Sequence, residues 1–266
     1  MDYNEKLISA AGKSGSIVCL GIDPVLEDIP LKVQSPEEKI VKFYSAIIDA
    51  TAAEIGAVKP NYAFFAQYGF AGLRALKKVL AYCKNKKLLT ILDAKRGDIG
   101  KSSEAYAREA FDFWKADAVT VAPYMGADSV KPFIDYASKG KGTYVLTRTS
   151  NKGAEDFQER NELYMEVAKK VKVWGAGAVV GATNTEQLKK INEFFGGSVP
   201  LLIPGVGAQG GSAKDVADVL KKYGDIKIHR INSSSGISYA YKKNNNSDYA
   251  GEAAKEVKKL NSEIGL

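Results

Sequence analysis

The chain has 266 residues, 45% of them hydrophobic, which is enough to bury one large core, so we expect a single domain over residues 1–266. The net charge is +7, but the lysines occur as scattered pairs in helical patterns, which predicts solvated helix faces and no nucleic-acid partner. No apolar run approaches the ~20 residues that cross a bilayer. The first residues lack the apolar stretch of a signal peptide, so we expect a cytoplasmic protein without a membrane partner.

Cysteine and histidine are scarce. Cys19 lies in an apolar run, Cys83 lies in a helical pattern, and His229 is the single histidine. Their number and spacing match neither a disulfide framework nor a zinc site. We expect two buried thiols and no metal.

Eight apolar runs predict buried strands, and a helical pattern follows each of them. The strands are expected at residues 16–24, 57–61, 88–93, 118–123, 143–149, 178–182, 201–204 and 226–232. The helices are expected from residue 36, over 70–84, 103–114, 128–138 and 161–173, from 185, from 212, and over 248–262. Ser35 and Pro36 mark the first of these starts as an N-cap followed by proline.

Continuous apolar strands that alternate with helices predict a parallel sheet covered on its outer face. Eight such units close a (β/α)8 TIM barrel, which is the α/β fold that we expect. A doubly wound open sheet is the alternative, although no G-x-G-x-x-G motif follows the first strand. In these barrels the chemistry lies at the carboxyl ends of the strands.

The third strand carries the most informative cluster. Asp93 and Lys95 are two residues apart, so a strand directs them to one face, and Asp98 follows the break at Gly97, where a loop can return it toward them. Carboxylates around an ammonium favour its charged form, which makes Lys95 a candidate proton donor. A charged turn at the end of a strand is the alternative.

Other polar residues fall at strand ends. Asp23 and Lys59 end the first two strands, and Thr149 with Ser150 follows the fifth. Unpaired burial of charges is costly, so we interpret these residues as site residues, with structural ion pairing as the alternative. The glycine-rich residues 204–211 and the serines at 233–235 follow strands seven and eight, where such barrels often bind phosphate. A tight turn without a ligand is the alternative.

Taken together, these motifs resemble orotidine 5′-phosphate decarboxylase, in the longer type of many bacteria and some protozoa. The matching residues are 21–24, 58–61, 92–100, 123–126, 149–151 and 204–211. The D-x-K-x-x-D string is specific when it occurs with Thr-Ser-Asn and Pro-Gly-Val-Gly-Ala-Gln-Gly-Gly. The resemblance implies decarboxylation of orotidine 5′-monophosphate (OMP) to uridine 5′-monophosphate (UMP), without a metal or organic cofactor.

The resemblance also implies a role for each site residue. Lys95 would protonate the C6 carbanion, and Lys59, Asp93 and Asp98 would complete the charge array. The expected protein is a homodimer in which Asp98, Ile99 and Ser102 of the partner subunit complete the site. Substrate contacts are implied for Asp23 and Asn61 at the ribose, Thr149 and Ser150 at the pyrimidine, Pro204 at the pocket wall, and Gln209 at the phosphate. The position of Ser234 and Ser235 after strand eight adds these two residues at the phosphate.

Two positions depart from the family pattern. Ser235 stands where the family has a phosphate-binding arginine, and Lys101-Ser102 stands where it has Asn-Thr. Loss of a charge-assisted contact to phosphate costs roughly 1.5–3 kcal/mol per bond. We therefore hypothesise a weakened decarboxylase, either a natural variant that uses another cation or an engineered substitution.

Two rival functions remain open. Related barrels such as 3-keto-gulonate 6-phosphate decarboxylase and hexulose phosphate synthase share the D-x-K-x-x-D string but act on sugar phosphates with magnesium. The missing arginine also allows a non-catalytic nucleotide-binding relative. Sensitivity to a chelator and turnover of OMP separate the three.

Overall fold

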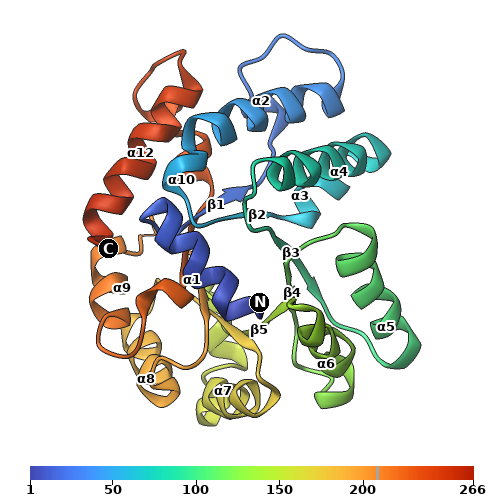
Figure 1. Ribbon diagram of the computed structural model, residues 1–266, viewed down its shortest axis with the longest axis vertical. Helices are drawn as coiled ribbons and strands as arrows, with labels where there is room; N and C mark the ends of the chain where they lie inside the picture. Colours follow the sequence, from blue (N-terminus) through green and yellow to red (C-terminus); the bar gives the residue numbers. More distant parts are fainter. Residues whose placement is uncertain (208–209) are drawn as a thin grey trace.

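Eight parallel strands form one sheet, and helices surround it (Figure 1). The structure is a computed structural model that describes residues 1–207 and 210–266. The strands are β1 (Val18–Ile22), β2 (Ala57–Pro60), β3 (Ile91–Arg96), β4 (Ala118–Val121), β5 (Gly142–Arg148), β6 (Gly177–Val180), β7 (Leu201–Ile203) and β8 (Arg230–Ser233). Their order is β2-β1-β8-β7-β6-β5-β4-β3. Parallel bridges between Val58 and Thr90 and between Asn61 and Asp93 join β2 to β3, which confirms the predicted barrel.

The helices follow the strands in the predicted alternation. They are α1 (Tyr3–Ser14), α2 (Pro36–Thr51), α3 (Tyr62–Ala66), α4 (Gly69–Asn85), α5 (Gly100–Arg108), α6 (Ala127–Ile134), α7 (Leu163–Trp174), α8 (Thr185–Phe195), α9 (Ala213–Leu220), α10 (Ser235–Ser238), α11 (Ala240–Lys243) and α12 (Tyr249–Ile264). In Figure 1, α1 lies across the barrel while the longer helices stand around it. No helix in the described part of the chain is long and apolar enough to span a membrane.

Side chains cap the starts of three helices, among them the predicted N-cap at Ser35. Ser35 accepts a hydrogen bond from the backbone N–H of Glu38, with Pro36 in the first turn of α2. Ser212 caps α9 and Asp248 caps α12 in the same way. These side chains satisfy backbone donors that have no partner inside the helix, so the capping residues fix where each helix begins.

The last predicted strand is wrong in its first half. Residues 226–228 form a 3-10 turn, and β8 begins only at Arg230. The Asp225 carboxylate accepts a hydrogen bond from the backbone N–H of Lys227, and the Arg230 guanidinium donates to the Lys227 carbonyl. These side-chain bonds outweigh the strand preference of the isoleucines.

The helix predicted over residues 103–114 also differs. α5 ends at Arg108, and Glu109–Phe113 continue as a π-helical turn. The backbone N–H of Trp114 bonds to the carbonyl of Glu109, and the Glu109 carboxylate is held by Arg96 and by Trp114 Nε1. The end of this helix is therefore set by the contacts of Glu109 with Trp114 and with Arg96 on β3.

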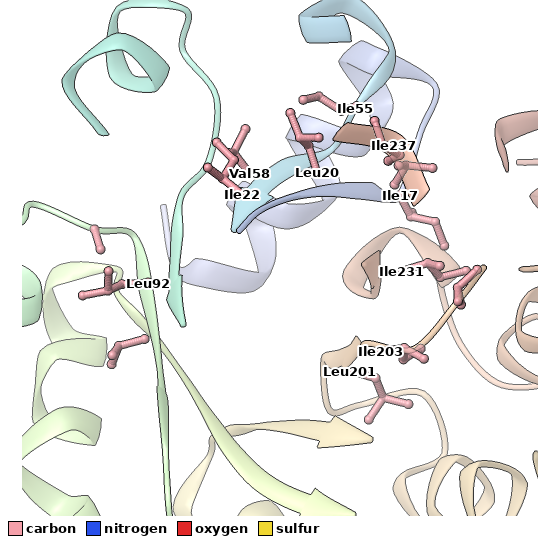
Figure 2. Packing of buried hydrophobic residues seen from close by; sticks show 14 of the residues in the cluster. Ile17, Leu20, Ile22, Ile55, Val58, Leu92, Leu201, Ile203, Ile231 and Ile237 are labelled. Atoms are coloured by element: carbon pink, nitrogen blue, oxygen red, sulfur yellow. The ribbon is translucent and has the colours of Figure 1, made fainter. Parts of the chain in front are cut away.

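Side chains alternate between the inside and the outside of the barrel. The outward residues, among them Leu20, Val58, Leu92, Ile203 and Ile231, pack against the helices (Figure 2). A smaller inner cluster contains Cys19, Ala57, Ile91, Ala118, Tyr144, Val179 and Leu202 of the strands with Tyr3 and Leu7 of α1. Cys19 and Cys83 are free and buried, as predicted. The inner cluster fills the amino-terminal half of the barrel and leaves the carboxyl ends for polar residues.

Candidate active site

A cavity of about 440 Å³ opens at the carboxyl ends of the strands. Of the predicted site residues, Asp23, Lys59, Asn61, Asp93, Lys95, Thr149, Ser150, Pro204, Ser234 and Ser235 line it. Lys59, Asp93 and Thr120 form the floor of the cavity. Each lies two residues after an inward-facing residue of the apolar inner cluster on the same strand, so its side chain also points into the barrel, one layer closer to the carboxyl ends. Sequence reasoning missed Thr120 and Asn232, although the same period of two selects both.

The Asp93 carboxylate is the centre of the site. Its Oδ2 lies 2.8 Å from Lys59 Nζ, and its Oδ1 lies 2.6 Å from Lys95 Nζ and 2.9 Å from Thr120 Oγ1. Burial by itself would raise the pKa of Asp93, but the charges of Lys59 and Lys95 outweigh burial and hold that pKa below its usual value. The structure therefore assembles a cation, an anion and a second cation in one row.

Lys59 and Lys95 differ in their surroundings. The Lys59 side chain is only 4% exposed, whereas that of Lys95 is 50% exposed. Burial opposes the charge of Lys59, yet Asp93 and Asp23 raise its pKa above the usual value. Lys59 is thus a fixed buried cation, while the amine of Lys95 reaches the open part of the cavity.

Asp93 and Lys95 meet for a different reason from the one predicted. β3 pairs with β4 through Leu92 with Val119 and Arg96 with Val121, and the register shifts between these pairs. Lys95 has a φ of 47°, so the backbone bulges instead of alternating. Both side chains line the cavity and contact each other, but regular strand geometry does not explain this arrangement.

Two buried oxygens at the floor have no hydrogen-bond partner among the described residues. They are Oδ1 of Asp23 and Oδ1 of Asn232. Burial raises the pKa of Asp23, and the charge of Lys59 opposes that effect. Buried polar atoms are normally paired, so both oxygens are positioned to accept a hydrogen bond from a ligand. Asn61, at the start of α3, uses its Oδ1 to accept from the backbone N–H of Ala63.

The segment after β5 is held by its own side chains. Gln158 donates to Thr149 Oγ1 at 2.8 Å and accepts from the Thr149 backbone N–H at 2.8 Å. The Thr149 hydroxyl donates to Asn151 Oδ1. The buried Arg148 forms an ion pair with Glu159. Gln158 was not predicted, because nothing in the local sequence connects it with Thr149.

The segments after β7 and β8 also line the cavity. Gly205 and Gly207 have φ values of 96° and 81°, which favour glycine at both positions. Gly21 lets the segment after β8 approach β1 closely, since a Cβ atom there would lie 1.9 Å from Ser234 Oγ. Gln209, a predicted phosphate contact, lies outside the described residues.

Cations are few around this cavity. Among the described residues that line it, only Lys59 and Lys95 are positively charged, and both bond to Asp93. Ser235 and its neighbours from the segments after β7 and β8 therefore offer hydroxyl and backbone groups at this end of the cavity. In the same part of the chain, no group of three or more acidic, histidine or cysteine side chains is arranged to hold a metal ion.

Asp98, Ile99 and Ser102 do not line the cavity of the single chain. The Asp98 carboxylate accepts a hydrogen bond from the backbone N–H of Ile99, and its carbonyl accepts from Ser129 Oγ. Asp98 forms no ion pair with a described residue, so the loop does not return its carboxylate to Lys95 within one chain. Ile99 is 59% exposed, and Ser102 is exposed on α5.

Comparison with known proteins decides between the related barrels. Residues 16–248 match the model of the orotidine 5′-phosphate decarboxylase / HUMPS family. The chain is 43% identical to orotidine 5′-phosphate decarboxylase of Flavobacterium johnsoniae, covering 94% of this chain and 92% of that protein. It is 42% identical to the Parabacteroides distasonis enzyme of the same name, covering 96% and 93%. The chain belongs to the orotidine 5′-phosphate decarboxylase family.

Solved structures of this family have the same fold. Leishmania donovani OMP decarboxylase matches with a TM-score of 0.80 and 31% identity, covering 100% of both chains. Orotidine 5′-monophosphate decarboxylase of Methanocaldococcus jannaschii, complexed with the inhibitor BMP, matches with a TM-score of 0.70 and 25% identity, covering 92% of this chain and 98% of that chain. The family function is decarboxylation of OMP to UMP in pyrimidine synthesis, so this chain is a carboxy-lyase.

Proposed function

We propose that the row of Lys59, Asp93 and Lys95 carries out the decarboxylation of OMP to UMP, with Lys95 as the proton donor. The observation that carries this proposal is the contact of both ammonium groups with one buried carboxylate at the floor of the cavity. No other described carboxylate lining the cavity has two such contacts. The proposal assigns the chemistry to these three side chains together with Asp98 of the partner subunit, and to no metal or organic cofactor.

The charge row suits the reaction because negative charge moves to a carbon atom. The C6–carboxyl bond breaks, carbon dioxide leaves, and its bonding electron pair stays on C6. An ammonium group fixed beside that carbon stabilises the charge as it develops. Lys95 then transfers a proton to C6, which gives UMP, and recovers a proton from solvent once the product has left the cavity.

The remaining side chains are proposed to bind the nucleotide. Asp23 and Asn61 contact the ribose hydroxyls, and the unpaired Oδ1 of Asp23 supports that role. Thr149 and Ser150 contact the pyrimidine edge, and Pro204 forms a wall. We assign the phosphate to Ser234, Ser235 and Gln209. A relative that binds the inhibitor BMP supports a small-molecule substrate.

We propose that the active form is a homodimer, with Asp98, Ile99 and Ser102 of the partner subunit at the edge of each site. Three observations support it. Lys95 has an open side, Ile99 is largely exposed, and a groove of about 580 Å³ lined by Tyr62 and Arg96 adjoins Lys95. An exposed apolar residue beside an open charged site is suited to a second subunit. We also propose a cytoplasmic location, in accord with two free cysteines.

The first experiment follows the ultraviolet absorbance of OMP with purified protein, with and without a chelator. The expected result is turnover that the chelator does not change, and no turnover by Lys95→Ala. Turnover that a chelator abolishes supports a magnesium-dependent enzyme like the related sugar-phosphate barrels. Binding of OMP without turnover supports a non-catalytic nucleotide-binding relative. Full activity of Lys95→Ala contradicts the proposal.

The second experiment tests the shared site. Lys95→Ala and Asp98→Ala subunits are mixed after each has been found inactive. A 1:1 mixture is expected to recover about a quarter of the wild-type activity, because half of the dimers are mixed and each of those has one intact site. A mixture that stays inactive, or a monomer in sedimentation at the assay concentration, contradicts the shared site.

A further inference from the structure

Thr120 lies opposite the bulge of β3. In the pairing of β3 with β4, the residues between Leu92 and Arg96 face Thr120 alone. Its hydroxyl oxygen lies 2.9 Å from the backbone nitrogen of Lys95 and 2.9 Å from Asp93 Oδ1. The side chain is only 1% exposed. A single hydroxyl therefore contacts both the backbone of Lys95 and the side chain of Asp93.

The backbone of Lys95 needs such a contact. Its φ of 47° lies in the left-handed region, which residues other than glycine adopt rarely. In a regular ladder its N–H would bond to a carbonyl of β4, but the bulge leaves that donor to Thr120 Oγ1. The bond to Thr120 thus takes the place of a ladder bond and fixes the turn that sends the Lys95 side chain back to Asp93.

The hydrogen-bonding capacity of the hydroxyl indicates its role. A threonine hydroxyl has one proton, and Thr120 donates it to Asp93 Oδ1. It accepts the Lys95 N–H with one lone pair. No proton remains for a substrate oxygen, so Thr120 is placed to act through Asp93 and Lys95.

We propose that Thr120 is a positioning residue that holds Lys95 in its left-handed conformation and aligns it with Asp93 for proton transfer. This inference rests on the proposed role of Lys95 as proton donor. Substrate binding depends on other residues around the cavity, so Thr120 affects the chemical step more than it affects affinity. Residues held in rare backbone conformations at reactive sites are typically supported by such surrounding contacts.

The kinetic test compares Thr120→Val, Thr120→Ser and Thr147→Val. Valine keeps the shape but removes the hydroxyl, and we expect kcat to fall roughly 100-fold, the scale of an ångström of misplacement, with KM little changed. Serine keeps the hydroxyl and is expected to restore most of kcat. Thr147 on β5 is equally buried, bonds to the Val145 carbonyl and does not line the cavity, so its valine variant is expected to keep wild-type kcat.

A result in which Thr120→Val keeps wild-type kcat, or in which serine and valine are equally impaired, overturns the inference. A crystal structure of Thr120→Val supplies a test without activity: we expect Lys95 to leave the left-handed region and its Nζ to separate from Asp93 Oδ1. An unchanged φ and contact would also overturn it. If the wild-type protein does not turn over OMP, the proposed function fails, and the crystal structure still decides whether Thr120 holds Lys95.

Discussion

Lys59 Nζ and Asp93 Oδ2 lie 2.8 Å apart at the floor of the cavity, and both side chains are buried. Removing one member of a buried ion pair leaves an uncompensated charge, which typically costs about 3–5 kcal/mol. We therefore expect Asp93→Asn to lose roughly this amount of unfolding free energy at pH 7, because Lys59 keeps its burial and loses its main counter-ion. Urea unfolding of both proteins measures the difference.

The pH dependence of that difference has a definite sign. The folded pKa of Asp93 lies below its unfolded value of about 3.9, so the stability from its charge is present above that pH and is lost as the pH falls through the folded pKa. The difference in unfolding free energy between wild type and Asp93→Asn should therefore become smaller below pH ~4. Asp49→Asn is the control: it breaks an exposed, solvent-screened pair with Lys86 and should lose much less unfolding free energy. Equal losses in both variants contradict this account.

Ser235 allows a direct test of the phosphate end. An arginine there would add a cation where the described lining residues have none besides Lys59 and Lys95. A charge-assisted bond to phosphate of about 1.5–3 kcal/mol predicts that Ser235→Arg raises kcat/KM for OMP by roughly 10- to 100-fold. The value for orotidine, which lacks the phosphate, should hardly change. Ser247→Arg adds the same charge on an exposed loop outside the cavity and should change neither value. Equal gains on both substrates contradict the assignment.

The sequence predicts the barrel and most of the cavity because both follow from local rules. Apolar runs and capping residues such as Ser35 determine the elements, and the carboxyl ends of parallel strands meet at one end of a barrel. Asp23, Lys59 and Asp93 could therefore be selected from their positions in the chain alone. Side chains two residues apart on a strand point to the same side. Applied to the inward-facing residues of β4 and β8, this rule also selects Thr120 and Asn232.

Features that depend on contacts between distant segments could not be predicted in this way. The bulge at Lys95 needs the Thr120 hydroxyl from the next strand. The turn at residues 226–228 depends on Arg230, whose own partners come from other parts of the chain. The bonds from Gln158 to Thr149 close a loop that has no strong local signal. In each case, a side chain takes the place of a backbone partner, which the strand and helix patterns do not reveal.

His229 gives a second pH prediction. Burial lowers its pKa from 6.5 to about 3, and its Nδ1 accepts a hydrogen bond from the Leu201 backbone N–H. When the pKa of a histidine is lower in the folded state than in the unfolded state, its neutral form contributes to the unfolding free energy. That contribution is fully present above the unfolded-state pKa and is lost as the pH falls toward the folded-state pKa. The unfolding free energy of the wild type should thus fall by about 1.4 kcal/mol per pH unit below pH 6.5, relative to that of His229→Asn, whose amide does not titrate.

Urea unfolding of wild type and His229→Asn between pH 7 and pH 4 measures how the unfolding free energy of each protein changes with pH. Proton NMR offers an independent check, because the chain has a single histidine and hence one imidazole Cε1–H signal. That signal should not shift between pH 8 and pH 5. A titration midpoint near pH 6.5, together with parallel stability slopes, contradicts the prediction.

Arg230 fixes α1 to the amino-terminal end of the barrel. The side chain is fully buried, and its guanidinium donates to the carbonyls of Leu7 on α1, Gly56, Lys227 and His229. Methionine fills similar space but leaves four carbonyls without this donor, so we expect Arg230→Met to lose about 3 kcal/mol or more of unfolding free energy. Arg230→Lys keeps the positive charge but lacks the planar set of donors, so it should restore little of the lost unfolding free energy.

Lys6→Met is the control, since Lys6 also ties α1 to the barrel through the Gly140 carbonyl but is only partly buried. Urea unfolding and amide exchange of α1 distinguish the variants. Protection of α1 amides that is unchanged in Arg230→Met contradicts this role.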